Sequence, residues 1–210
     1  TTGLTGADPT PGAAPMAPAP PAVPRMLLLD GARAGDAIVI VGERGSILFS
    51  EDQAVTWQRA VSPTRAALTG VSFAPVAPPR PVRRGWAVGH DAIILTTLDA
   101  GRTWVRQFQG ENLQNSFLDV VAVDEQHAIA VGAYGLYLST ADGGSTWTRR
   151  KIRAEDSHLN RISQGPTGTL YLAGEAGTLL RSTDQGATWI PMRAPYTGSF
   201  YGVMPLDRRT

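Results

Sequence analysis

The sequence contains no cysteine, and this absence excludes several kinds of chemistry. Without thiols the chain can form no disulfide, no thiolate metal site and no cysteine nucleophile. A charge excess is also missing, because the formal net charge is only +1, so no overall field favours nucleic acid or an anionic membrane. Lys151 is the one lysine, and all other basic residues are arginine. Codon bias explains this most simply, although guanidinium groups also suit carboxylate-bearing or aromatic partners.

Long apolar runs are absent too, since no stretch reaches the roughly eighteen residues of a membrane span. Residues 7–24, ADPTPGAAPMAPAPPAVP, are rich in proline and alanine and nearly uncharged, so we expect residues 1–24 to form a disordered tail. The chain starts at Thr1 without an initiator methionine. We expect a periplasmic or otherwise exported protein whose signal peptide has been removed, with a trimmed fragment as the alternative.

The motifs of common enzymes are missing as well. The three histidines, His90, His127 and His158, are far apart and show no H-E-x-x-H spacing, and no G-x-S-x-G elbow occurs. The Phe-Arg-Ile-Pro signature of sialidases is absent, and its nearest string, NRIS from Asn160, lacks both Phe and Pro. The composition and motifs therefore indicate no catalytic residue, no metal site and no cofactor.

What the sequence does contain is an internal repeat. The windows SEDQAVTW, TLDAGRTW, TADGGSTW and STDQGATW start at Ser50, Thr97, Thr140 and Ser182. Their tryptophans, Trp57, Trp104, Trp147 and Trp189, follow one another at intervals of 47, 43 and 42 residues. Each window is preceded by a related run (VGERGSILFS, VGHDAIILTT, VGAYGLYLST or AGEAGTLLRS), and a shorter apolar run lies before that. Four short apolar runs per unit predict a four-stranded propeller blade.

The repeated window is predicted to be a structural turn between the last two strands of a blade. Its aspartate can accept hydrogen bonds from backbone N–H groups, and its glycine can adopt positive φ. A calcium loop needs more carboxylates than one per window, and a phosphate loop needs a lysine and a following helix. The first copy has Ala54 in place of glycine, so we expect its turn to be strained or differently shaped. The structural residues of the windows are Asp52, Trp57, Asp99, Gly101, Trp104, Asp142, Gly144, Trp147, Asp184, Gly186 and Trp189.

These windows resemble the Asp-box, or BNR repeat, of sialidase-type β-propellers. Combined with the upstream VGxxG run, the chain resembles the photosystem II stability/assembly-factor-like propellers over about residues 26–206. That family also occurs in bacteria without photosynthesis, so the resemblance does not identify the source. It implies an all-β propeller of four-stranded antiparallel blades within residues 25–210.

The expected blades cover about residues 26–60, 66–107, 116–150 and 158–193, and residues 199–206 resemble the first strand of a fifth. Asp-box propellers are commonly six- or seven-bladed, and an open ring exposes strand edges, so we expect a piece of a larger ring. A closed four-bladed ring latched by the last strand, and completion by a second copy, are the alternatives.

Loops of such a blade alternate between two faces of the ring, which predicts where partners bind. The second blade carries six extra residues in PVAPPRPVRR, a proline-stiffened loop expected on the same face as the Asp-boxes. The opposite face is formed by the turns between the second and third strands and by the crossovers between blades. Candidate partner-binding residues are Arg80, Arg83 and Arg84 of the insertion, and Arg44, Tyr134, Glu175 and Arg153 of the opposite face.

The resemblance favours a non-enzymatic scaffold that binds another protein, and we expect that partner to be membrane-associated. We expect the scaffold itself neither to insert into the membrane nor to bind nucleic acid. Such a scaffold assists the assembly or stability of an envelope or membrane complex. The alternatives are a sialidase-like glycoside hydrolase or glycan-binding propeller and, with less support, an accessory of a membrane transporter. A glycosidase would need converging arginines and a paired tyrosine and glutamate.

Overall fold

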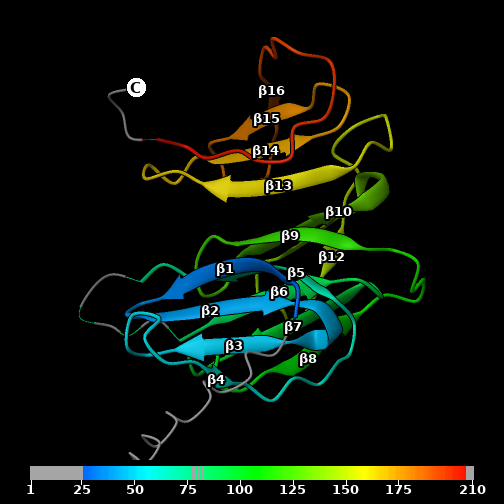
Figure 1. Cartoon of the computed structure of the whole chain (residues 1–210). Helices are drawn as coiled ribbons and strands as arrows, with labels where there is room; N and C mark the ends of the chain where they lie inside the picture. The colour runs from blue at the N-terminus through cyan, green and yellow to red at the C-terminus, as the bar shows by residue number, and fades with distance from the viewer. Residues whose placement is uncertain (1–25, 77–78, 80, 82, 207–210) are drawn as a thin grey trace, which may run out of the picture.

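The computed structural model describes residues 26–76, 79, 81 and 83–206. The tail expected over residues 1–24 lies outside this part of the chain, and so does Arg80. The described residues form four antiparallel sheets of four strands each (Figure 1). The prediction of an all-β propeller fold is confirmed. No helix long and apolar enough to cross a membrane occurs among the described residues.

Each sheet is one blade, and its strands follow one another in chain order. Blade 1 consists of β1 (Leu28–Ala34), β2 (Ala37–Gly42), β3 (Ile47–Ser50) and β4 (Gln58–Arg59). Blade 2 consists of β5 (Leu68–Phe73), β6 (Gly85–Gly89), β7 (Ile93–Thr97) and β8 (Val105–Gln109). Blade 3 consists of β9 (Phe117–Ala122), β10 (Ala128–Gly132), β11 (Tyr137–Thr140) and β12 (Thr148–Arg149). Blade 4 consists of β13 (Leu159–Gln164), β14 (Leu170–Gly174), β15 (Leu179–Ser182) and β16 (Ile190–Pro191).

The hydrophobic core lies between blades rather than inside any one of them. Three buried clusters fill the spaces between blades 1 and 2, blades 2 and 3, and blades 3 and 4. Strand β6 shows why apolar residues occupy both faces of a strand: Ala87 belongs to the first cluster, whereas Trp86 and Val88 belong to the second. The continuous apolar runs in the sequence are therefore the signature of sheets that are covered on both sides.

The first strand of each blade lies toward the axis of the ring. Strand β5 lies between β1 and β9, and β9 lies next to β13. The third residue of each first strand occupies the same register position in all four blades. It pairs with the residue that precedes the terminal glycine of the second strand in its blade, which is a valine or an alanine. The four residues at this position are Asp30, Gly70, Asp119 and Arg161. The axis is therefore lined by charges at three of the four positions.

These three charged residues form one ion cluster across the axis. Arg161 Nη2 lies 3.0 Å from Asp30 Oδ1, and its Nε lies 3.3 Å from Asp119 Oδ2. Asp30 also accepts the N–H of Val71 at 2.9 Å, and Asp119 accepts that of Ile162 at 2.8 Å. Each carboxylate thus binds the inner strand of the blade that follows its own. The cluster links blade 1 to blade 4 directly.

Gly70 leaves the space that this cluster requires. A Cβ atom at Gly70 would lie 2.9 Å from both the Cα and Oδ1 of Asp119, so no side chain fits there. Asp119 itself is only 2% exposed. Burial raises the pKa of its carboxyl group to about 7, and the opposing effects of Arg161 and the Ile162 N–H do not cancel that rise.

Residues 199–206 form no ladder with β13, but side chains of β13 hold their backbone. Asn160 Nδ2 donates to the Phe200 carbonyl at 2.9 Å, and Ser163 Oγ donates to the Val203 carbonyl at 3.0 Å. Between blades 2 and 3, Thr69 Oγ1 donates to the Phe117 carbonyl in the same way, at 2.9 Å. This likeness supports the expected fifth inner strand, which stays a prediction.

Replacing glycine in the fourth window should destabilise the fold because that position touches the preceding blade. Gly186 has a φ of 86°, and a Cβ there would approach Ile129 Cδ1 to 2.5 Å. We expect Gly186→Ala to lower the free energy of unfolding by about 2–3 kcal/mol. Ala54 already adopts φ 70° and is exposed, so the matched change Ala54→Gly should alter the free energy of unfolding by less than about 1 kcal/mol. Urea denaturation measures both, and equal effects would contradict the difference between the two positions.

The raised pKa of Asp119 predicts a stability that falls as pH rises. Between its ordinary pKa of about 4 and its folded value of about 7, the folded state holds a proton that the unfolded state has lost. The free energy of unfolding should therefore decrease by about 2 kcal/mol from pH 5 to pH 8. Asp119→Asn should flatten this slope, whereas the exposed control Asp36→Asn should keep it. Urea denaturation at pH 5, 6, 7 and 8 makes the comparison. If the free energy of unfolding of Asp119→Asn falls with pH as steeply as that of the wild type, Asp119 is not the group responsible.

Candidate functional site

The repeated windows, residues 50–57, 97–104, 140–147 and 182–189, all form the same closed turn, which we call the Asp turn. In the second copy, Asp99 Oδ1 accepts the Thr103 N–H at 2.9 Å, and Oδ2 accepts the Thr103 hydroxyl at 2.6 Å. Thr97 donates to Asp99 and accepts the Gly101 N–H at 3.1 Å. The other three copies repeat these bonds. Each aspartate therefore binds its own chain.

The hydrogen bonds of the Asp turn also fix the charge of its aspartate. In blades 1, 3 and 4, the threonine hydroxyl and N–H lower the pKa of the aspartate to about 2. Because the folded pKa lies below the ordinary value, the bonds stabilise the fold at neutral pH and are lost only as pH falls toward 2. A carboxylate held in this way is a poor general acid.

Ala54 does not reshape the first Asp turn, contrary to one of the two outcomes expected from the sequence. Its N–H still binds the Ser50 hydroxyl at 2.9 Å, and its φ of 70° matches the left-handed conformation of the glycines. The corresponding glycines, such as Gly101, are buried against the preceding blade, whereas Ala54 is exposed. In the same way Trp57 is 37% exposed, while Trp104 is 4% exposed. Tolerance of alanine thus follows from the absence of a described neighbour at that position.

Arg84, a candidate for partner binding, forms a hydrogen bond from blade 2 to blade 3. Its Nη1 donates to the Gly143 carbonyl of the next Asp turn at 2.6 Å, and its guanidinium lies 5.7 Å from the centre of the Trp86 ring. Arg150 repeats this arrangement with the Gly186 carbonyl and the Tyr137 ring. Arg84 therefore has a structural role that the sequence did not reveal.

The opposite face of the ring carries the turns between the second and third strands, here called tip turns. Their central residues, Arg44, Asp91, Tyr134 and Ala176, all have φ between 51° and 57°. This left-handed conformation is unusual outside glycine. Arg44 is exposed on blade 1, and its side chain forms no hydrogen bond or ion pair with another described residue. Tyr134 is 65% exposed on blade 3.

Three of the predicted residues on this face, Tyr134, Glu175 and Arg153, lie together between blades 3 and 4. The Tyr134 ring meets the His158 ring edge to face, with centroids 4.9 Å apart. Glu175 accepts the His158 N–H at 2.9 Å, and its other oxygen lies 3.4 Å from His158 Nδ1. Arg153 contacts the Thr178 hydroxyl and forms an ion pair with Glu155 at 3.1 Å. His158 joins this group, although it was not among the residues selected as partner-binding.

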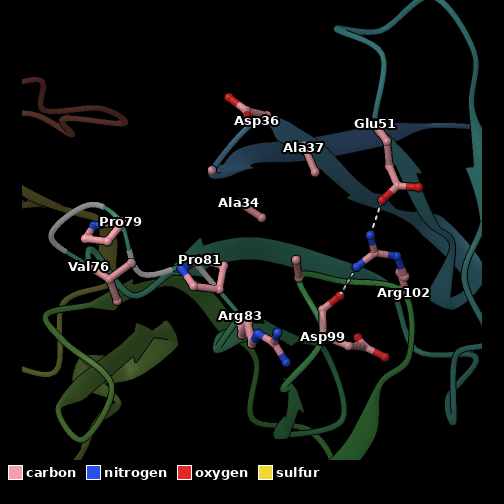
Figure 2. Close-up of a pocket in the computed structure, with 12 residues that line it drawn as sticks. Ala34, Asp36, Ala37, Glu51, Val76, Pro79, Pro81, Arg83, Asp99 and Arg102 are labelled. Atoms are coloured by element: carbon pink, nitrogen blue, oxygen red, sulfur yellow. Dashed lines mark hydrogen bonds and ion pairs between the residues drawn. The ribbon is translucent and has the colours of Figure 1, made fainter.

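Arg83 lies on the Asp-turn face, in the wall of a cleft of about 750 Å³ (Figure 2). The cleft is bounded by the β1–β2 turn of blade 1, the Asp turn of blade 2, and Val76, Pro79, Pro81 and Arg83 of the insertion. Glu51 and Arg102 form an ion pair at one side of it. The sequence indicated the insertion and the face on which it lies. It did not indicate Asp36, Glu51 and Arg102 as cleft residues, because the pattern within one repeat does not show which side chains of two neighbouring repeats meet.

Comparison with known proteins agrees with this architecture. Residues 107–209 match the family model described as photosynthesis system II assembly factor YCF48. The rice photosystem II stability/assembly factor HCF136, chloroplastic, is 30% identical over 123 residues, which are 57% of this chain and 28% of the rice protein. Residues 107–209 thus resemble the photosystem II assembly-factor-like propeller family. The predicted family resemblance is thereby confirmed.

Solved structures related to this assembly-factor-like propeller show the same fold. YCF48 bound to D1 peptide and YCF48 from Cyanidioschyzon merolae each have a TM-score of 0.61 and 20% identity. They cover 79% and 80% of this chain, which spans 54% and 57% of theirs. An ancestral GH74 enzyme has the same TM-score with 14% identity, over 80% of this chain and 24% of its own. The chain thus spans about half the length of the YCF48 structures.

Two neighbouring arginines should differ sharply in their effect on stability. Arg84→Ala removes the bond to Gly143 and the contact with Trp86, so we expect the free energy of unfolding to fall by about 1–2 kcal/mol. Arg83→Ala removes an exposed side chain and should change it by less than about 0.5 kcal/mol. Chemical denaturation of both variants is the measurement. A larger loss in Arg83→Ala would mean that the roles assigned to the two side chains are wrong.

Proposed function

We propose that this chain is a non-enzymatic propeller scaffold that binds another protein and assists the assembly or stability of an envelope or membrane complex. The strongest support is the match of residues 107–209 to a family named for an assembly factor, together with a solved structure of the same fold that is bound to a peptide. We also propose that the protein is exported and works in the periplasm or an equivalent compartment, next to a membrane-associated partner.

The chemistry of the described carboxylates supports a binding role over a catalytic one. The four Asp-turn aspartates are engaged with their own backbones, and Asp30 and Asp119 are engaged with Arg161 and neighbouring strands. Glycoside hydrolysis instead requires a carboxylic acid and a base or nucleophile that face a substrate. The GH74 relatives, at 14–16% identity, share the fold alone. The described residues also contain no group of three or more His, Asp or Glu that could hold a metal ion.

Candidate binding residues lie on both faces of the ring. Arg83 lines the cleft on the Asp-turn face, and Arg44 and the Tyr134 cluster lie on the tip face. Arg80 of the insertion remains a candidate and lies outside the described residues. Arg84 is less suited to binding because its guanidinium is engaged.

Site-specific photo-crosslinking in intact cells tests the proposed function. A benzophenone amino acid would replace Arg83, Tyr134 or, as a control on the outer strand β12, the exposed Arg149. We expect one membrane-complex subunit to be captured from position 83 or 134 and not from 149, and deletion of the gene to lower the amount of that complex. Capture of no protein above background from either face, or an unchanged complex after deletion, would contradict a role in assembly. Turnover of a fluorogenic sialoside by the purified protein would favour the glycosidase alternative.

A further inference from the structure

The cleft on the Asp-turn face has the size and floor of a binding groove. Its volume of about 750 Å³ falls within the range of ordinary ligand sites. Ala34, Ala37 and Ala100 are among its lining residues, and Ala34 and Ala37 lie between Asp36 and Arg83 in Figure 2. Small apolar side chains at these positions leave room for an apolar group of a ligand. Pro79 and Pro81 continue this apolar surface on the insertion side.

Part of the charge around the cleft is already neutralised within the protein. Arg102 forms an ion pair with Glu51 and donates to the Asp99 carbonyl at 2.8 Å, which joins the first two Asp turns. The Asp99 carboxylate is held by Thr103. These groups therefore form a preorganised wall and do not need a ligand to satisfy them.

Two opposite charges remain available. Asp36 belongs to the β1–β2 turn and Arg83 to the insertion, and Figure 2 shows them on opposite sides of the cleft. Both residues are exposed or partly exposed, and neither side chain has a partner among the residues that the structure describes. A uniformly charged ligand would be attracted by one of them and repelled by the other. A ligand with both charges and an apolar group between them would satisfy the whole cleft.

We propose that this cleft binds a turned peptide segment in which an apolar residue is flanked by one basic and one acidic residue. The basic side chain pairs with Asp36, the acidic one with Arg83, and the apolar one rests on the alanine floor. In an extended chain the middle of three side chains points away from its two neighbours, so the segment must turn for all three to face the cleft. This inference rests on the proposed function, and it specifies the partner segment and the place where it binds.

Short peptides test the proposal directly on the whole chain. The probes are capped heptapeptides with the central sequence Lys-Leu-Asp, Lys-Leu-Lys, Asp-Leu-Asp or Ser-Leu-Ser, each titrated while the methyl resonances of Ala34, Ala37 and Ala100 are followed by NMR. We expect Lys-Leu-Asp to bind wild type about fivefold more tightly than Ser-Leu-Ser, as two partly exposed ion pairs allow. Arg83→Glu should change the preference to Lys-Leu-Lys, and Asp36→Arg should change it to Asp-Leu-Asp. The mixed probe needs no assumption about peptide direction, because it can bind either way round.

Two controls separate binding from folding. Both charge variants alter side chains at the surface, so their thermal unfolding midpoints should stay at the wild-type value. Ala37→Phe fills the floor and should abolish binding of all four peptides while the tip-face resonances of Tyr134 and His158 stay unchanged. Equal affinity for all four peptides, preferences that do not change with charge, or methyl shifts confined to other blades would overturn the proposal. If crosslinking still captures a partner in that case, the proposed function stands and only the peptide motif and its groove are wrong.

Discussion

Every blade of this protein can bury its two faces only against other blades, and the rest of the structure depends on this constraint. A four-stranded sheet has no core of its own, so the apolar side chains of β6, β7 and β10 are buried by what lies on either side of them. Close approach between sheets then limits which residues fit. Gly101, Gly144 and Gly186 are needed where an Asp turn meets the preceding blade, and Gly70 is needed where β5 meets Asp119. Ala54, where no described neighbour approaches, shows the same turn without that limit.

Polar groups hold the blades in register once the apolar faces have brought them together. On the Asp-turn face, Arg84 and Arg150 bind carbonyl groups of the next Asp turn. At the axis, Asp30 and Asp119 bind N–H groups of the following inner strand and share Arg161. These polar contacts connect neighbouring blades both on the Asp-turn face and at the axis.

The two faces of the ring offer different surfaces for recognition. The tip face presents single exposed side chains on strained turns, with the Tyr134, His158 and Glu175 cluster between blades 3 and 4. The Asp-turn face presents a walled cleft, and among its described lining residues Asp36 and Arg83 carry unpaired charges.

The sequence alone determined the repeat, the four strands of each blade and the closed turn, because these depend on residues no more than a few positions apart. The Asp99 to Thr103 bonds, for example, span four residues and recur in every window. It also indicated the insertion and its face, because loop alternation follows from strand count. Only the tertiary structure decided which charges are engaged: Arg84 and Arg83 are neighbours in sequence, yet one binds the next blade and the other faces the cleft. The pairing of Asp30 with Arg161, 131 residues apart, likewise arises from how the blades pack, which no single repeat encodes.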